Sequence, residues 1–138
     1  MKVFGLNERE YILDLKKCSK PRDRCSVYHK MARVLLHEMF SGYNIYEEVK
    51  LPGSTDPSKK SVLYLDFFIP NGKVGVEVHG EQHFKFVPFF HKTKMQYLQA
   101  KARDVAKIKW CEINSFKLIE LRWDDNIEYW REKIERSR

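Results

Sequence analysis

The stretch VLYLDFFIPNGKVGVEVHG, residues 62–80, holds two apolar runs on either side of the dipeptide Asn71-Gly72. Asn-Gly between apolar runs is typical of a β-hairpin, because both central residues of a type I′ turn need positive φ. With these two residues as the loop, Asp66 lies directly opposite Glu77 on the neighbouring strand. The stretch therefore predicts a hairpin that brings two carboxylates together.

Side chains alternate between the two faces of a strand, so the hairpin has two distinct faces. The first is entirely apolar and is predicted to be a core face; it holds Leu63, Leu65, Phe67, Ile69, Val74, Val76 and Val78. The second holds Tyr64, Asp66, Phe68, Gly75, Glu77 and His79. Opposed carboxylates destabilise a sheet unless something offsets their repulsion. A divalent cation does so, since Mg²⁺ prefers oxygen ligands and is commonly held by one or two carboxylates. The alternative is an exposed face whose carboxylates are merely solvated.

The residues that follow Glu77 favour a functional interpretation. The run EVHGEQH places His79 on the strand and His83 just beyond its end. Metal-assisted hydrolysis needs metal ligands, a base for water and a donor to the phosphate or leaving oxygen. We therefore expect catalytic roles for Asp66, Glu77, His79 and His83, with Asp66 and Glu77 as metal ligands. A zinc-protease site is not expected, because HGEQH does not match H-E-x-x-H.

The other expected elements indicate one α/β domain over residues 1–138, with a helical extension at about 1–25. Capping and apolar spacing predict helices at 6–17, 26–40, about 91–113 and 126–136. Alternation predicts further strands at 43–51 and 116–123. The three cysteines are odd in number and lack a C-x-x-C pair, so free thiols are expected. No apolar stretch is long enough to span a membrane, and the N-terminal residues lack an apolar leader, so a cytoplasmic protein is expected.

A net charge of +7 and a pI near 9.3 favour polyanionic partners. Basic residues gather on the expected long helix: Lys92, Lys94, Lys101, Arg103 and Lys107. Because this helix follows the histidines directly, we expect it to contact DNA phosphates, which position a duplex without reading its sequence. A solvated basic helix face is the alternative.

Taken together, YLDFFIP, a short turn and VEVHGEQH resemble the very-short-patch-repair (Vsr) and EDxHD homing branch of the PD-(D/E)XK nucleases. The similarity extends from Ser26 to Trp123 and includes Arg103-Asp104, Lys107 and the strand LIEL at 118–121. The Pro that precedes the Asp in the family is replaced by Leu65.

The resemblance implies a restriction-endonuclease-like fold with a four-stranded mixed sheet flanked by helices. It also implies DNA cleavage that depends on Mg²⁺ or Mn²⁺. By position, Asp66 is similar to the family's principal metal ligand and Glu77 to its second acidic residue. His79 stands where many members have Lys, and His83 is similar to the downstream His near the attacking water. His29 occupies the place of an early helix Glu, and which of His29, Glu38, Glu47 and Glu48 completes the site stays open.

The sequence thus predicts a DNA endonuclease that nicks or cuts both strands, of the kind found in phages and mobile elements. It is compatible with a homodimer or with an accessory DNA-targeting partner. Two alternatives are kept: a structure-specific junction resolvase, and a non-catalytic nucleic-acid-binding module on the same fold.

Overall fold

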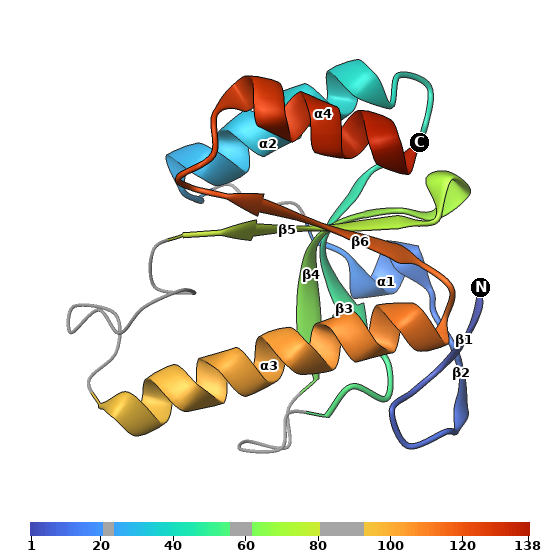
Figure 1. Ribbon diagram of the computed structural model, residues 1–138. Coiled ribbons are helices and arrows are strands. Elements are labelled where there is room, and N and C mark those ends of the chain that lie inside the picture. The colour runs from blue at the N-terminus through green and yellow to red at the C-terminus, as the bar shows by residue number, and fades with distance from the viewer. Residues whose placement is uncertain (21–23, 56–61, 81–92) are drawn as a thin grey trace.

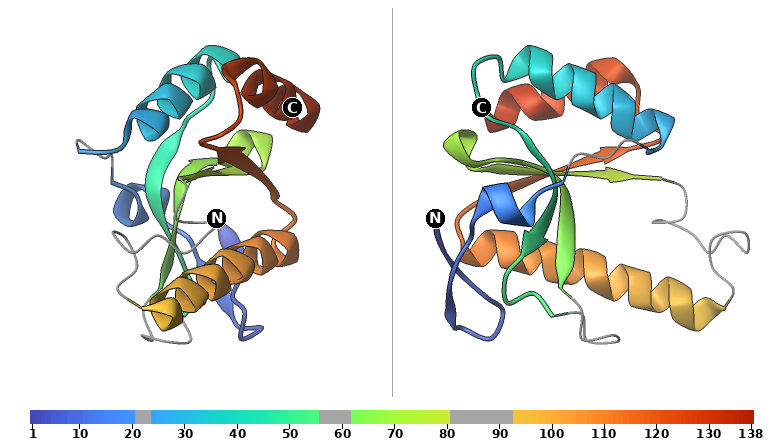
Figure 2. Two further views of the ribbon diagram at one scale, coloured as in Figure 1. Left: turned by 60° about the vertical axis from the view of Figure 1, so that its left-hand side comes forward. Right: turned by 180° about the vertical axis from the view of Figure 1, so that it is seen from behind.

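A mixed sheet with strand order β3-β4-β5-β6 forms the centre of the computed structural model, which describes residues 1–20, 24–55, 62–80 and 93–138 (Figure 1). Its strands are β3 Tyr46–Leu51, β4 Leu63–Ile69, β5 Val74–His79 and β6 Lys117–Arg122. Neighbouring strands from β3 to β5 are antiparallel, and β6 runs parallel to β5. Helices α2 Val27–Met39 and α4 Ile127–Ser137 cover one face, and α3 Lys94–Ile113 lies across the other (Figures 1 and 2). The predicted α/β class and four-stranded mixed sheet flanked by helices are confirmed.

Helices α2 and α4 begin where the sequence predicts, and α3 begins at Lys94, a few residues after the predicted start at about 91. Each has an N-cap residue whose side chain accepts a hydrogen bond from a backbone N–H of the first turn: Ser26 for α2, Thr93 for α3 and Asn126 for α4. Such caps satisfy donors that have no partner inside the helix. None of the helices in the described ranges is long and apolar enough to cross a membrane.

The predicted helix at 6–17 is wrong. The N-terminal residues form a two-stranded antiparallel sheet, β1 Lys2–Phe4 with β2 Glu10–Ile12, before the short helix α1 Leu15–Cys18. Asn7 does not cap a helix, because its Oδ1 accepts a hydrogen bond from the Arg9 N–H at 3.1 Å inside the β1–β2 turn. Asparagine side chains often make such local bonds in turns. The N-terminal extension therefore contains a hairpin as well as a helical turn.

The β4–β5 register is as predicted, but the turn type is not. Phe67 pairs with Val76 and Ile69 with Val74, as the predicted register requires. Pro70–Gly72 form a 3-10 turn, and the positive φ of +53° falls on Lys73 rather than on Asn71 or Gly72. A proline has no N–H for a ladder and fits the first turn of a helix, so the loop includes residues 70–73 instead of two residues.

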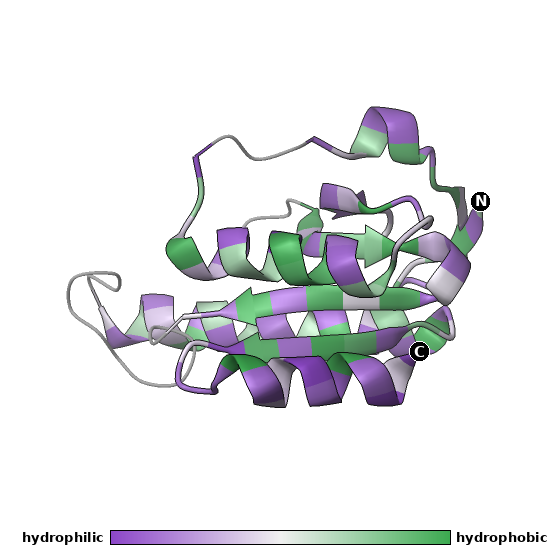
Figure 3. Ribbon diagram, turned by 90° about the horizontal axis from the view of Figure 1, so that it is seen from above, coloured by the Kyte–Doolittle hydropathy of each residue, from purple (hydrophilic) through white to green (hydrophobic). Residues whose placement is uncertain are grey.

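The core has two parts, one on each side of the sheet. Under α2 and α4 lie buried residues that include Leu36, Phe67, Val76, Leu121 and Trp130. Under α3 and the N-terminal hairpin lie others that include Val3, Leu63, Leu65, Phe68 and Trp110. The apolar face predicted for the hairpin is thus divided between the two parts, and on the second face Phe68, Glu77 and His79 are buried whereas Tyr64 is exposed. Seen from above, the strands carry long hydrophobic stretches, whereas the helix that ends at the C-terminus is mostly hydrophilic (Figure 3).

Candidate functional site

Asp66 and Glu77 meet where the β4–β5 ladder ends. The last pair in the ladder is Phe67 with Val76, and the next residue outward on each strand is one of the two acids. Asp66 Oδ2 accepts a hydrogen bond from the Val78 N–H at 2.8 Å, so the side chain takes the place of a backbone partner. This bond fixes the Asp66 carboxylate beside β5. The structure therefore brings together the two acids that the hairpin register predicts to be opposed.

Lys107 is the cation of this cluster. It extends from α3, and its Nζ lies 3.1 Å from Glu77 Oε1, with the Lys107 side chain only 17% exposed. Burial would lower the pKa of Lys107, but the negative charges of Glu77 and Asp66 outweigh burial and raise the pKa. Lys107 was expected to contact DNA; in the structure its ammonium is turned toward the two carboxylates instead of outward.

The surroundings of Glu77 disfavour its ionised form. Its side chain is almost fully buried, and burial followed by the charge of Asp66 raises the pKa of Glu77 well above its ordinary value, which Lys107 only partly offsets. One ammonium beside two carboxylates leaves a net negative charge when both acids are ionised. A further cation at this point would favour the ionised form of both acids.

His79 lies on the same strand as Glu77 and pairs with an acid from β6. Its Nε2 is 3.4 Å from Glu120 Oε1, and its ring is almost fully buried whereas Glu120 is 44% exposed. The hydrogen bond from His79 lowers the pKa of Glu120. Because β5 and β6 are parallel, Glu77 and Glu120 are direct neighbours in the register. Glu120 thus orients the His79 ring and adds a third carboxylate to this face of the sheet.

His29 and Glu47 form a separate buried network with Arg33. Glu47 accepts hydrogen bonds from Arg33 Nε at 2.9 Å and Arg33 Nη2 at 2.8 Å, and it lies 2.8 Å from His29 Nε2. Burial would raise the pKa of Glu47, but these hydrogen bonds outweigh it and lower the pKa. The His29 ring stacks on Phe67 with centroids 4.4 Å apart, on the α2 side of the sheet. These contacts explain why the fold buries His29 and Glu47 without calling on a catalytic role for either.

Glu48 and Glu38, the other two candidates for completing the site, differ in position. The pairs on either side, Glu47 with Phe67 and Val49 with Leu65, put Glu48 across from Asp66, where the ladder skips one pair and φ of Glu48 is +48°. Glu38 is held by Arg131 on the outer side of α2, at 3.1 Å. Of the four candidates, Glu48 is the one whose register adjoins Asp66.

The other basic and histidine residues predicted for the site lie on α3 or outside the described residues. Lys94 is exposed on α3, and Lys101 and Arg103 are half-exposed on the same helix. His83 and Lys92 lie outside the described residues, so their contacts are not part of the site described above. Among the ranges that the structure describes, no group of three or more His, Cys, Asp or Glu side chains is arranged to hold a metal ion. Asp66 and Glu77 remain a two-carboxylate site, which is the number that Mg²⁺ commonly takes from a protein.

The sequence reasoning missed Glu120 and the pairing of Lys107 with Glu77. Glu120 sits in the stretch 118–121, where alternation puts it on the opposite face from the buried Ile119 and Leu121. Only the parallel pairing with β5, which joins segments about 40 residues apart, places it beside Glu77. All three cysteines are free, as expected, and burial raises the pKa of Cys111 to about 12, so this thiol stays protonated near neutral pH.

Three viral proteins of uncharacterized function are similar to this chain. Protein 307L of Invertebrate iridescent virus 6 is 37% identical over 73 residues, which is 53% of this chain and 37% of that protein. Protein 033L of Invertebrate iridescent virus 3 is 36% identical over 66 residues, 48% of this chain and 34% of that protein. Protein 094L of Frog virus 3 is 32% identical over 77 residues, 55% of this chain and 50% of that protein. The matches thus span half or less of the length of these relatives.

No family model matches the chain, and no solved structure matches it. The likeness to the Vsr and EDxHD branch therefore stays a prediction based on the hairpin motif.

Proposed function

We propose that this chain is a divalent-metal-dependent DNA endonuclease. The observation that carries the proposal is the Asp66–Glu77 pair at the end of the β4–β5 ladder, with Lys107 Nζ 3.1 Å from Glu77. Burying one carboxylate beside another destabilises the folded chain, because the two negative charges repel each other and lose contact with water. Such an arrangement is typical of a site that binds a cation during function.

The donor set suits a hard cation such as Mg²⁺ or Mn²⁺. Both donors are carboxylates, and the nearby ammonium of Lys107 already shows that positive charge is favoured at this point. Asp66 and Glu77 would hold the ion, which supplies Lewis-acid activation of a phosphate and of water when bound. Lys107, which pairs with Glu77 at 3.1 Å, would be available to contact a phosphate oxygen when the two acids hold the ion.

The remaining residues have roles that follow from their contacts. His79, whose Nε2 lies 3.4 Å from Glu120 Oε1, would donate a proton or a hydrogen bond to the phosphate or leaving oxygen. His83 keeps its sequence-based role as the residue that orients the attacking water. The exposed and half-exposed cations of α3 would contact the DNA backbone near the site.

Cleavage of supercoiled plasmid tests the proposal. We expect conversion to nicked or linear DNA with Mg²⁺ or Mn²⁺, none with EDTA, and loss of at least about 100-fold in rate for Asp66→Ala and Glu77→Gln. Glu112→Gln, an exposed acid on α3, is the matched control and should cleave at the normal rate. An Asp66→Ala variant that cleaves like the unmodified protein would refute the proposal.

A non-catalytic DNA-binding module is the second candidate. It is favoured by one observation, the ion pair that Lys107 already makes with Glu77. Under this alternative DNA binding is independent of metal and of the Asp66 carboxylate, and no substrate is cleaved. Fluorescence anisotropy with labelled duplex and four-way-junction DNA, with and without Mg²⁺, separates the module from the endonuclease and from a junction resolvase.

A further inference from the structure

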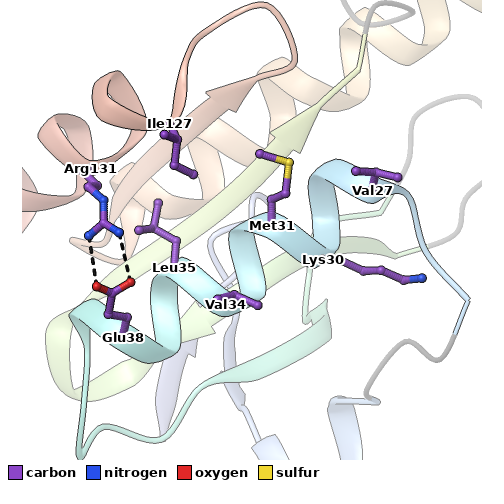
Figure 4. A pocket seen from close by; sticks show the side chains of 8 residues that line it. All are labelled: Val27, Lys30, Met31, Val34, Leu35, Glu38, Ile127 and Arg131. Carbon is purple, nitrogen blue, oxygen red and sulfur yellow. Dashed lines mark hydrogen bonds and ion pairs between the residues drawn. The ribbon is translucent and has the colours of Figure 1, made fainter.

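An apolar groove lies on the outer side of α2 and α4, across the sheet from Asp66 and Glu77. It encloses about 370 Å³ and is lined by Val27, Lys30, Met31, Val34, Leu35, Glu38, Ile127 and Arg131 (Figure 4). Val27 and Val34 are each 68% exposed. Neighbouring apolar side chains with this much exposure, rimmed by charged residues, mark an interaction surface.

The charged residues of the groove lie toward its two ends, Lys30 at one end and Glu38 with its partner Arg131 at the other. Lys30 is near the beginning of α2, and Glu38 is near its end, where it binds Arg131 through two hydrogen bonds of 3.2 and 3.1 Å (Figure 4). Val34 lies midway between Lys30 and Glu38, four residues from each. Residues four apart stack along one side of a helix, so these three form one row with an apolar centre.

We propose that this groove is the contact surface between two copies of the chain, arranged about a two-fold axis that passes beside Val34. A two-fold interface must be self-complementary, because each surface meets a copy of itself. When α2 packs antiparallel against α2 of the second copy, Val34 meets its own counterpart. The rotation also places Lys30 beside Glu38 of the second copy, and Glu38 beside the second Lys30. The row therefore complements itself in both charge and apolarity.

The size of the surface indicates a modest dimer. From Val27 to Glu38 a helix rises roughly 16 Å, and two adjacent helices are roughly 20 Å wide. A face of this size, with the relief of its side chains, buries on the order of 1,000 Å² in the pair, which is near the lower limit for a specific interface. Its apolar centre and charged rim are the usual anatomy of such contacts. We therefore expect a dimer that dissociates on dilution.

Sedimentation equilibrium over a range of protein concentrations tests the surface. The unmodified chain should dimerise, and Val34→Glu should weaken the dimer at least about 10-fold, because two carboxylates would be buried face to face at the axis. Val34 is mostly exposed, so this variant should keep its fold, as circular dichroism will check. Lys109→Glu, an exposed charge reversal on α3, is the control and should dimerise normally. A chain that stays monomeric, or a dimer that tolerates Val34→Glu, overturns the proposal.

Charge exchange tests the antiparallel arrangement. Lys30→Glu alone places Glu against Glu twice in a homodimer, and Glu38→Lys alone places Lys against Lys twice, so each variant should dimerise weakly. An equimolar mixture of the two should recover the dimer, because both contacts then join opposite charges. The recovered species should contain one copy of each variant by native mass spectrometry. A mixture that dimerises no better than its components overturns the arrangement.

Discussion

Glu77 is an acid that the fold buries next to another acid, and this has a consequence for stability. Its pKa in the folded chain is raised well above the ordinary value of 4.5 by burial and by Asp66. A group with a raised folded pKa contributes its stability fully below the unfolded value and loses it as pH rises toward the folded value. Glu77 should therefore lower the stability of the fold near neutral pH, because the unfolded chain releases this proton more readily than the folded chain does.

We predict that Glu77→Gln is more stable than the unmodified chain near pH 8 and equally stable near pH 4. The glutamine cannot ionise, so it avoids the cost that grows as pH rises, and the charge of Asp66 still compensates that of Lys107. Thermal melting at a series of pH values measures the difference, with Glu112→Gln as the control for losing a charge on the surface. A melting-temperature difference that is flat with pH, or that has the opposite sign, would contradict the raised pKa of Glu77.

Lys107 should be coupled energetically to Glu77. Breaking a buried ion pair by removing one partner leaves a charge without compensation and costs about 3 kcal/mol. We predict that Lys107→Met lowers the free energy of unfolding by about this amount at pH 8, and that adding Glu77→Gln restores most of it. Chemical denaturation of both single variants and the double variant gives the coupling energy. Additive effects would show that the 3.1 Å contact is not a stabilising pair.

The sequence revealed this site to the extent that its contacts are local. The proximity of Asp66 and Glu77 followed from the hairpin register, because the two strands are joined by a short loop. The contacts of Lys107 and Glu120 could not be predicted from the sequence, because they depend on how α3 and β6 pack against the sheet from distant parts of the chain. His29 was expected to contribute to catalysis, and its bond to Glu47 likewise depends on packing between separate elements.

At the scale of elements, the β4–β5 loop shows why turn type is harder to predict than register. A two-residue and a four-residue loop with the same centre give the same pairing, so the alternation of the strands cannot distinguish them. Pro70 determines the turn type, because it starts a 3-10 turn and moves the left-handed backbone conformation to Lys73. The backbone at Lys73 has φ +53° and ψ +45°. Such angles suit glycine and are costly for a β-branched residue.

Lys73 therefore offers a direct test of the loop. We predict that Lys73→Val lowers the free energy of unfolding by about 1 kcal/mol, whereas Lys73→Gly leaves it unchanged or slightly higher. Urea denaturation at one pH measures both. In a type I′ loop the positive φ angles would fall on Asn71 and Gly72, and valine at 73 would then be well tolerated in a strand. A stable Lys73→Val variant would thus favour the two-residue loop.

The N-terminal hairpin is the element that the sequence patterns predicted wrongly, as a helix. Leu6, Asn7 and Glu10 fit a helix start, but the hairpin is held by contacts with distant residues. The Asn114 side chain, at the end of α3, bonds both the N–H and the carbonyl of Phe4 at 2.6 and 2.8 Å. Val3 and Leu13 are buried beside Trp110. A three-residue strand has little local signal, and contacts from the other end of the fold select it.

At the scale of the whole molecule, the sheet separates two surfaces. The cluster of Asp66, Glu77 and Lys107 lies on the side covered by α3, and the apolar groove lies on the outer side of α2 and α4 (Figures 1 and 4). The resemblance to the Vsr and EDxHD branch implied a mixed sheet flanked by helices, and the structure has this layering. The sequence did not predict that Val27 and Val34 of α2 would be exposed.

The arrangement of the two surfaces predicts how the proposed enzyme cuts. In a dimer formed through α2, the two clusters of Asp66, Glu77 and Lys107 lie on the far sides of the assembly and face away from each other. One duplex then reaches one cluster at a time, so each encounter breaks one strand. We predict that supercoiled plasmid accumulates as nicked circles before any linear form appears, and that linear DNA arises only from later, independent nicks.

An agarose-gel time course with Mg²⁺ measures the order of products, and Val34→Glu serves as the comparison. If the clusters act independently, the monomeric variant nicks at the same rate per chain as the dimer, because the α2 surface contributes nothing to the chemistry. Linear DNA that forms together with the first nicks, and persists in Val34→Glu, would mean that two clusters act on one duplex without the α2 contact. The copies would then have to associate through a surface that brings their α3 faces together, and the α2 arrangement would be wrong.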